Sequence, residues 1–169
     1  MTNHRKHIAI FRILVILSTV VGADVLAEDK QPVNVPHWDS FEAAGKRYGI
    51  DPVLLASVAK VESDYDQSAK NTNRDGSIDV GIMQINNKYW AQPLDKIGIS
   101  WEMVETSADT NINVGAWILA QAFQEAGVGW LAIGAYNAGF SDKKRRYRRH
   151  YAVKVYEALR SLERERDNL

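Results

Sequence analysis

The sequence of 169 residues contains no cysteine and only four histidines. His4 and His7 lie near the amino terminus, which leaves His37 and His150 for the rest of the chain. These two histidines have no metal-ligand spacing, and no cysteine can complete a zinc site. The chain also has no glycine-flanked serine of the nucleophile-elbow type, so a serine–histidine triad is not expected. We therefore predict neither a metal nor another cofactor.

The chain also lacks an excess of charge of either sign, since Lys and Arg number 21 and Asp and Glu number 21. This balance, without a recognisable nucleic-acid-binding module, argues against a nucleic-acid partner. One local exception is a basic run made of Lys143, Lys144, Arg145, Arg146, Tyr147, Arg148 and Arg149. We interpret this run as the solvated start of a helix. A surface for phosphates or for an acidic partner is the alternative.

No apolar stretch is long enough to span a bilayer comfortably. A predominantly apolar run covers residues 13–21, follows the basic residues Arg5, Lys6 and Arg12, and precedes a small-residue ending at Ala27. This arrangement is typical of a secretory signal peptide. We predict that residues 1–27 are removed after Ala27, which gives a periplasmic protein without a stable membrane span. An uncleaved amino-terminal anchor is the alternative.

The remaining residues suffice for one domain with a hydrophobic core and are too few for two. Residues 28–36, which include two prolines, are expected to form an extended leader. Residues 37–169 are expected to form one monomeric domain. Apolar residues at helical spacing predict a first helix from Trp38 that stops at Gly49. Asp51 as N-cap and the following proline predict a second helix that runs to about Tyr65.

The polar string of residues 71–79 precedes an apolar segment, residues 80–85, and predicts a small β-hairpin lobe. Helical spacing returns at residues 112–123 and 130–138, and a basic last helix carries an apolar stripe over residues 147–162. The expected fold class is therefore α+β and mainly helical, with one small β lobe.

Glu62 is the first candidate catalytic residue. Leu55, Val58 and Glu62 fall at positions i, i+3 and i+7 of the second helix. Glu62 therefore projects from the face that packs into the core. Partial burial raises the pKa of a carboxyl group, which allows it to hold a proton near neutrality. The alternative places Glu62 at the edge of this face, where it pairs with Lys60 or Arg47.

Asp79, at the end of the polar string, is the second candidate catalytic residue. A glutamate on a helix that faces an aspartate on a β element is the two-carboxylate arrangement of glycoside cleavage. Asn71, Asn73 and Asp75 in the same string also imitate the first half of a calcium-binding EF-hand loop. The twelfth position of that loop is Ile82 rather than glutamate. A turn is therefore the preferred interpretation, and calcium is the alternative.

Three motifs occur in order along the chain: Glu62-Ser63, Gly81-Ile82-Met83-Gln84-Ile85-Asn86 and Ala135-Tyr136-Asn137-Ala138-Gly139. The first two, with the turn between them, resemble the active-site stretch of animal c-type lysozymes. All three resemble bacterial lytic transglycosylases. The chain is similar to the small exported members that accompany type III and type IV secretion systems and conjugative pili, from about His37 to the last helix. Some of those members carry cysteines near His37 and Asp109, where this sequence has none.

The resemblance implies a lysozyme-like fold and a peptidoglycan glycan strand as substrate. It implies that Glu62 is the catalytic acid and Asp79 the second carboxylate, and that secretion-system or pilus assembly proteins are partners. The residues expected to bind the glycan are Ser63, Met83, Gln84, Asn86, Trp90, Tyr136 and Asn137. We assign Trp117 and Trp130 to packing.

Two alternatives to a transglycosylase remain at this point. One is a lysozyme-type hydrolase, in which Asp79 is the nucleophile or stabiliser and water completes the reaction. The other is a non-catalytic subunit that binds glycan or assembly proteins. The semi-buried Glu62 favours an enzyme, because a binding module needs no such acid.

Overall fold

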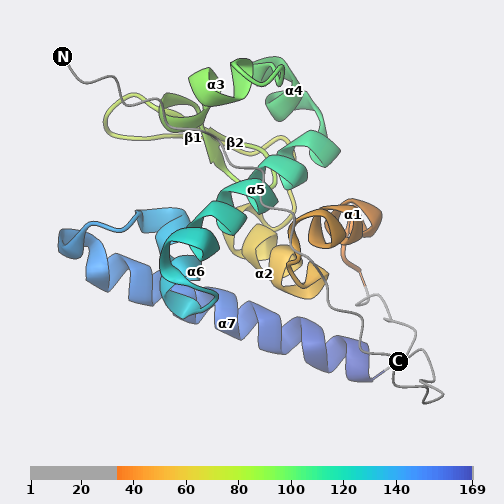
Figure 1. Cartoon of the computed structure of the whole chain (residues 1–169). Coiled ribbons are helices and arrows are strands. Elements are labelled where there is room, and N and C mark those ends of the chain that lie inside the picture. Colours follow the sequence, from red (N-terminus) through yellow and green to blue (C-terminus); the bar gives the residue numbers. More distant parts are fainter. Residues whose placement is uncertain (1–33, 169) are drawn as a thin grey trace, which may run out of the picture.

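The computed structural model describes residues 34–168 (Figure 1). The predicted signal peptide and the leader up to residue 33 lie outside the described residues. At the end of the leader, Val35 is buried in the hydrophobic core. The folded part of the chain therefore begins before residue 37, where we expected the domain to start.

Two helices follow, and their boundaries agree with the capping residues. Helix α1 (Trp38–Tyr48) ends at Gly49, which takes a left-handed φ of 67°. Helix α2 (Pro52–Ser63) begins after Asp51, whose carboxylate accepts a hydrogen bond from the backbone N–H of Val53 at 2.7 Å. It ends two residues earlier than predicted, because Asp64 and Tyr65 have positive φ values of 52° and 68°. Glu62 therefore lies in the last turn of α2.

The β lobe has three antiparallel strands, β1 (Lys70–Thr72), β2 (Ile78–Val80) and β3 (Ile85–Asn86), in the order β1-β2-β3. The predicted hairpin is thus confirmed and extended by a third strand. The register places Asp79 of the central strand opposite Asn71 on one side and Asn86 on the other.

Helices α3 (Asn87–Asp95) and α4 (Trp101–Thr106) were not predicted; α3 packs against β2 and β3, and α4 packs against α3 and α5. Each begins at a polar cap: the side-chain oxygen of Asn86 accepts from two N–H groups of α3, and the Ser100 hydroxyl accepts from the N–H of Met103. The short length of α4 and Pro93 inside α3 hide the helical period in the sequence.

The rest of the domain is built from α5 (Ala108–Ala126), α6 (Trp130–Ala138), the short 3₁₀ helix η1 (Asp142–Lys144) and α7 (Arg145–Asp167). Helix α7 runs beneath α2 and α6, on the opposite side of the molecule from the β lobe (Figure 1). Helices α6 and α7 approach closely at Gly134, where a Cβ atom would lie 2.5 Å from the carbonyl oxygen of Arg148.

The mainly helical α+β class with a small β lobe is confirmed. Buried apolar residues of all the α-helices, α1 to α7, and of the β lobe form the hydrophobic core. Across residues 34–168, no helix is both long and apolar enough to cross a bilayer.

Candidate active site

Glu62 reaches from the last turn of α2 into a cleft between the β lobe and helices α6 and α7. Burial raises the pKa of its carboxyl group to about 7, a hydrogen bond from Tyr151 opposes this rise, and the negative charge of Asp79 adds to it. Lys60, a partner considered for Glu62, pairs with Asp64 at 3.4 Å instead. Glu62 thus holds its proton in a pH range where an ordinary carboxyl group has lost it.

Tyr151, on α7, donates a hydrogen bond of 2.7 Å to Oε1 of Glu62. Burial and the nearby Glu62 carboxyl raise the pKa of the Tyr151 hydroxyl well above its usual value, so this group keeps its proton. The Tyr151 ring stacks on that of Tyr136, with the two centroids 6.5 Å apart. We had assigned Tyr151 only to the apolar stripe of the last helix. A buried tyrosine hydroxyl usually has a hydrogen-bond partner. The sequence did not identify Glu62 as this partner, because the two residues lie 89 positions apart.

Asp79 lies in the same cleft, and both of its carboxylate oxygens accept hydrogen bonds from side-chain amides. Asn86 donates to Oδ1 at 2.6 Å and Asn73 donates to Oδ2 at 2.9 Å. The strand register produces this arrangement, because it places Asn86 directly opposite Asp79. Asp79 is therefore tied into the β lobe rather than free in the cleft.

The turn between β2 and β3 is held by side chains from three different helices. The Ser63 hydroxyl of α2 donates to the Ile82 carbonyl at 2.9 Å, and the Tyr136 hydroxyl of α6 donates to the Met83 carbonyl at 2.8 Å. Asn111 of α5 is fully buried and accepts from the Met83 N–H at 2.7 Å. These bonds fix the turn against the helices, and with it one wall of the cleft.

Asn111 also donates to the carbonyls of Val80 and Val104, each at 3.0 Å. Its side-chain amide fills the space beside Gly81, where a Cβ atom would lie 2.2 Å away. Sequence reasoning did not select Asn111. It lies one residue before the helix predicted at 112–123, and no pattern in the sequence marked it as buried; its burial becomes clear only from its hydrogen bonds to the β lobe and to Val104.

Gln84 and Asn86 line the cleft, but their amides are already engaged. Gln84, whose φ is 47°, donates to the Gly81 carbonyl at 2.9 Å and accepts from Asn71 at 2.5 Å. Asn86 donates to Asp79, and its oxygen caps α3. Their observed bonds are internal to the β lobe, so they shape the cleft wall.

The cleft has a volume of about 780 Å³, within the usual range of ligand sites. Among the residues that line it are seven of the nine predicted site residues: Glu62, Asp79, Gln84, Asn86, Trp90, Tyr136 and Asn137. The structure does not bring Ser63 and Met83 to the cleft. Ser63 supports the turn from behind, and the buried Met83 side chain packs against Gly115.

Asn137 differs from the other predicted amides because no residue within 34–168 forms a hydrogen bond with its side chain. It is exposed at the cleft, near the end of α6. Trp90 also lines the cleft, and its ring packs edge-on against Trp117 with centroids 5.5 Å apart. Asn137 therefore offers free donors and an acceptor to a ligand, while Trp90 forms part of an aromatic wall.

Among the other residues that line the cleft are four exposed aromatic or cationic side chains that the sequence interpretation did not assign to the site: Arg74, Tyr89, Lys144 and Tyr147. Tyr89 and Tyr147 are largely exposed. Exposed rings and cationic side chains at one cleft provide stacking faces and partners for carboxylates. Lys144 and Tyr147 belong to the basic run, so part of that run lies at the cleft rather than on a solvated helix face.

The polar string that imitates a calcium loop is occupied by internal bonds. Asp75 accepts from the Ser77 hydroxyl and N–H, and it pairs with Lys88 at 2.7 Å. The hydrogen bond from Lys88 holds the pKa of the Asp75 carboxyl well below its usual range. In the described part of the chain, no three histidine, cysteine or acidic side chains cluster as metal ligands would.

The family model "Transglycosylase SLT domain" matches residues 39–159, which include both carboxylates and the start of α7. The chain belongs to this family of peptidoglycan lytic transglycosylases. This SLT-domain protein is 40% identical over 125 residues to protein IpgF of Shigella flexneri, covering 72% of this chain and 82% of IpgF. It is 38% identical over 130 residues to invasion protein IagB of Salmonella typhimurium, and the match covers 77% of this chain and 81% of IagB.

A similar fold occurs in the solved structure of an inactive mutant of the lytic transglycosylase Slt from Pseudomonas aeruginosa. The TM-score is 0.63 at 20% sequence identity, and the match covers 78% of this chain. The SLT-domain protein spans about a quarter, 24%, of the length of that enzyme. The likeness shows that the two share a fold.

Proposed function

We propose that this SLT-domain protein cleaves the β-1,4 bond between N-acetylmuramic acid and N-acetylglucosamine and leaves 1,6-anhydromuramoyl ends. The observation that carries the proposal is the unequal environment of the two carboxyl groups. Glu62 holds a proton near neutrality, whereas Asp79 has both oxygens engaged by amides. One carboxyl group is thus prepared for proton transfer, and the other for a fixed electrostatic role.

In the first step, Glu62 donates its proton to the glycosidic oxygen while the bond from that oxygen to the muramoyl anomeric carbon breaks. Positive charge develops on the anomeric carbon. Asp79 carries the nearby negative charge that stabilises it, and the same charge raises the pKa of Glu62.

In the second step, the ionised Glu62 takes the proton from the muramoyl C6 hydroxyl, and that oxygen bonds to the anomeric carbon. Glu62 ends the cycle protonated, and no water is consumed. Tyr151 assists the first step, since its hydrogen bond favours the ionised form of Glu62 that this step produces, and it holds the carboxyl group in place during both steps. Asn137, the unpaired amide at the cleft, is the residue we assign to hydrogen bonding with the sugar.

The test is a digest of purified cell walls, followed by mass spectrometry of the released muropeptides. Anhydro products are lighter by one water than the reducing ends that a hydrolase leaves. The Glu62→Gln variant is the matched control, because it keeps the shape of the side chain without its proton. A digest that contains only reducing ends would establish the hydrolase, with Asp79 as its second catalytic group.

Asp79→Asn separates the same two mechanisms by rate. An electrostatic role predicts a loss that is clearly smaller than that of Glu62→Gln, whereas a covalent nucleophile would make the two losses similar. The observed amide bonds to both oxygens support the electrostatic role.

We further propose that the protein acts in the periplasm and opens the wall locally for a secretion or pilus apparatus. The similarity to invasion protein IagB and protein IpgF supports this role. Deletion of the gene should reduce assembly of the apparatus, and the wild-type chain but not Glu62→Gln should restore it. Full restoration by the inactive variant would show that cleavage is not what the apparatus needs.

A further inference from the structure

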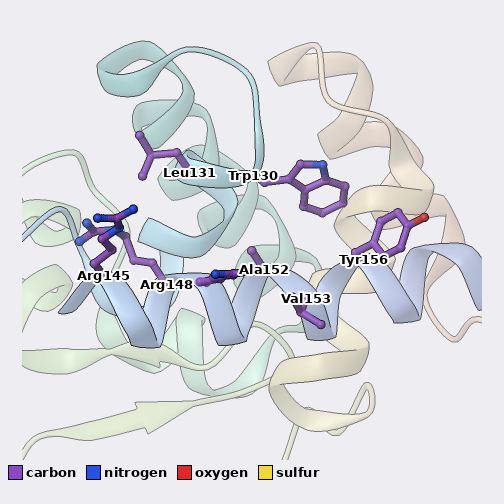
Figure 2. Close-up of a pocket in the computed structure, with 8 residues that line it drawn as sticks. Trp130, Leu131, Arg145, Arg148, Ala152, Val153 and Tyr156 are labelled. Atoms are coloured by element: carbon purple, nitrogen blue, oxygen red, sulfur yellow. The ribbon is translucent and has the colours of Figure 1, made fainter. Parts of the chain in front are cut away.

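A second hollow lies away from the cleft, between α6 and α7 (Figure 2). We call it the α6–α7 groove. It has a volume of about 380 Å³ and is lined by Trp130, Leu131, Arg145, Arg148, Arg149, Ala152, Val153 and Tyr156. None of these residues lines the cleft around Glu62.

The apolar side chains of the groove are unusually open to solvent. Trp130 is 44% exposed, Leu131 54% and Tyr156 48%. The Trp130 and Tyr156 rings meet edge to face with centroids 5.4 Å apart, so they form the aromatic end of the groove (Figure 2). We had assigned Trp130 to packing, and this was wrong: Gly129 precedes it at the start of α6, where the ring extends over α7 rather than into the core. Contiguous exposed apolar side chains mark interaction sites.

The other end of the groove is basic, as the arginines in Figure 2 show. Arg148 is buried there and donates to the carbonyls of Gly139 and Ser141 at 3.0 and 2.6 Å, so it belongs to the framework. Arg145 and Arg149 are exposed and lie one helical turn apart. Within residues 34–168, no carboxylate forms an ion pair with either of them. Two cations at the end of an apolar groove therefore remain available to a partner.

We propose that the α6–α7 groove binds an acidic amphipathic segment of a protein partner. Apolar side chains of the segment lie on Trp130, Leu131 and Tyr156, and its carboxylates pair with Arg145 and Arg149. From Arg145 to Tyr156 the groove follows α7 for about 16 Å, the length of roughly three helical turns. A segment of about eleven residues with apolar positions at i, i+4 and i+7 and acidic residues at one end matches this distribution.

This occupant fits the groove better than a glycan does. A sugar needs many hydrogen-bond partners, and the floor of the groove offers apolar side chains and alkyl stems. Paired arginines suit carboxylates because the guanidinium fork binds both oxygens. Binding at this site is also independent of the proposed catalysis, so it can be measured on the Glu62→Gln variant.

The experiment selects displayed random 16-residue peptides for binding to the purified Glu62→Gln protein. The selected sequences should be enriched in apolar and acidic residues together. Isothermal titration of the best peptide should show a Kd at least about tenfold higher for Trp130→Ala and for the double change Arg145→Glu with Arg149→Glu, as expected for an aromatic anchor and a paired charge. If Trp130→Ala lowers the Tm, Leu131→Ala tests the same apolar surface.

Two controls should leave the Kd within about twofold. Arg146→Glu reverses the charge of one arginine next to Arg145 on α7 but lies outside the groove, so it is compared with the single change Arg145→Glu, and Met103→Ala removes an exposed apolar side chain elsewhere. Selected peptides without acidic residues, or equal weakening by Arg146→Glu, would overturn the proposal. So would dimerisation or binding to anionic vesicles that Trp130→Ala abolishes, since a second copy or a membrane would then occupy the groove.

Discussion

At the residue scale, neighbouring groups shift the pKa of the Glu62 carboxyl group in opposite directions. Burial and the charge of Asp79 raise the pKa of its carboxyl group, and the hydrogen bond from Tyr151 lowers it. The resulting value of about 7 keeps a large share of the groups protonated at neutral pH and still permits ionisation. A group with this balance can act first as an acid and then as a base, as a transglycosylase requires.

Changing either neighbour should shift the pH profile, in opposite directions. Because activity starts from protonated Glu62, kcat/KM should fall as the pH rises through about 7. Tyr151→Phe removes a bond to the ionised form, so the falling limb should move to higher pH by about one unit. Asp79→Asn removes a negative neighbour, so the limb should move to lower pH.

Rate measurements on a soluble glycan between pH 5 and 9 check these shifts. Tyr156→Phe is the control, because this tyrosine lies on the same helix and lines the α6–α7 groove instead. Identical profiles for wild type, Tyr151→Phe and Asp79→Asn would mean that another group controls the limb.

Glu62→Gln should abolish cleavage and also stabilise the protein above neutral pH. The pKa of Glu62 is about 7 in the folded chain, against an ordinary value near 4.5, so ionisation costs stability as the pH rises through this window. Because glutamine cannot ionise, the substitution should raise the free energy of unfolding by roughly 2 to 3 kcal/mol at pH 8. Activity should fall by a factor of about a hundred or more.

Thermal unfolding of both proteins at two pH values provides the check. The variant should have the higher Tm at pH 8 and nearly the same Tm as wild type at pH 4, where both side chains are neutral. An equal difference in Tm between the variant and wild type at both pH values would show that the stabilisation is unrelated to the ionisation of Glu62.

At the element scale, α7 and the η1 helix before it have three different roles. Tyr151 faces Glu62, Lys144 and Tyr147 line the cleft, and Arg145 and Arg149 line the α6–α7 groove. The sequence interpretation of the basic run as a solvated helix start holds for Arg146, which lines neither hollow, and is wrong for Arg148, which is buried. Neighbouring residues of a helix lie on different faces. Because the residues of the basic run are chemically alike, the sequence did not show which of them lie at the cleft, at the groove or in solvent.

Lys144→Gln combined with Tyr147→Ala should therefore weaken cleavage of intact cell walls. Both side chains line the cleft, where they can contact the sugar or its acidic peptide, so the change should raise KM several-fold and alter kcat little. Arg146→Gln should leave both constants unchanged. A fall in kcat with KM unaffected would mean that this pair supports Glu62 rather than the substrate.

Helix ends with local signals were predictable from the sequence, and contacts between distant elements were not. Gly49 and Asp51 mark the end of α1 and the start of α2 through their own backbone and side-chain chemistry. The partner of Glu62 lies 89 residues away on α7, and no local pattern connects the two. The buried Asn111 was missed for the same reason, since its hydrogen bonds cross from α5 to the β lobe.

At the scale of the whole molecule, the net charge is balanced, but the two hollows differ in the charged residues that line them. The cleft carries the acidic groups Glu62, Asp75 and Asp79, with Arg74 and Lys144 also lining it, whereas the α6–α7 groove carries arginines alone among charged residues. Substrate and protein partner would then bind at separate places on α6 and α7. This separation would allow the enzyme to work on the wall while it is held by its partner.

The amino terminus determines whether the whole molecule is released or stays anchored, and we predict release by cleavage after Ala27. The basic start, the short apolar run and the small residue at the end of the segment favour a signal peptidase site over a stable membrane span. Cleavage there would preserve Val35, which packs into the core, so the processed chain should have the Tm and activity of the intact domain. Mass spectrometry of protein recovered from the periplasm should give a chain that starts at Glu28. Replacing Ala27 with a bulky residue such as Phe should block processing and move the protein to the membrane fraction, whereas Lys30→Gln, outside the signal, should have no effect. An intact amino terminus in the membrane fraction of wild-type cells would instead show that the segment is an anchor, and the enzyme would then reach only the glycan strands near the membrane surface.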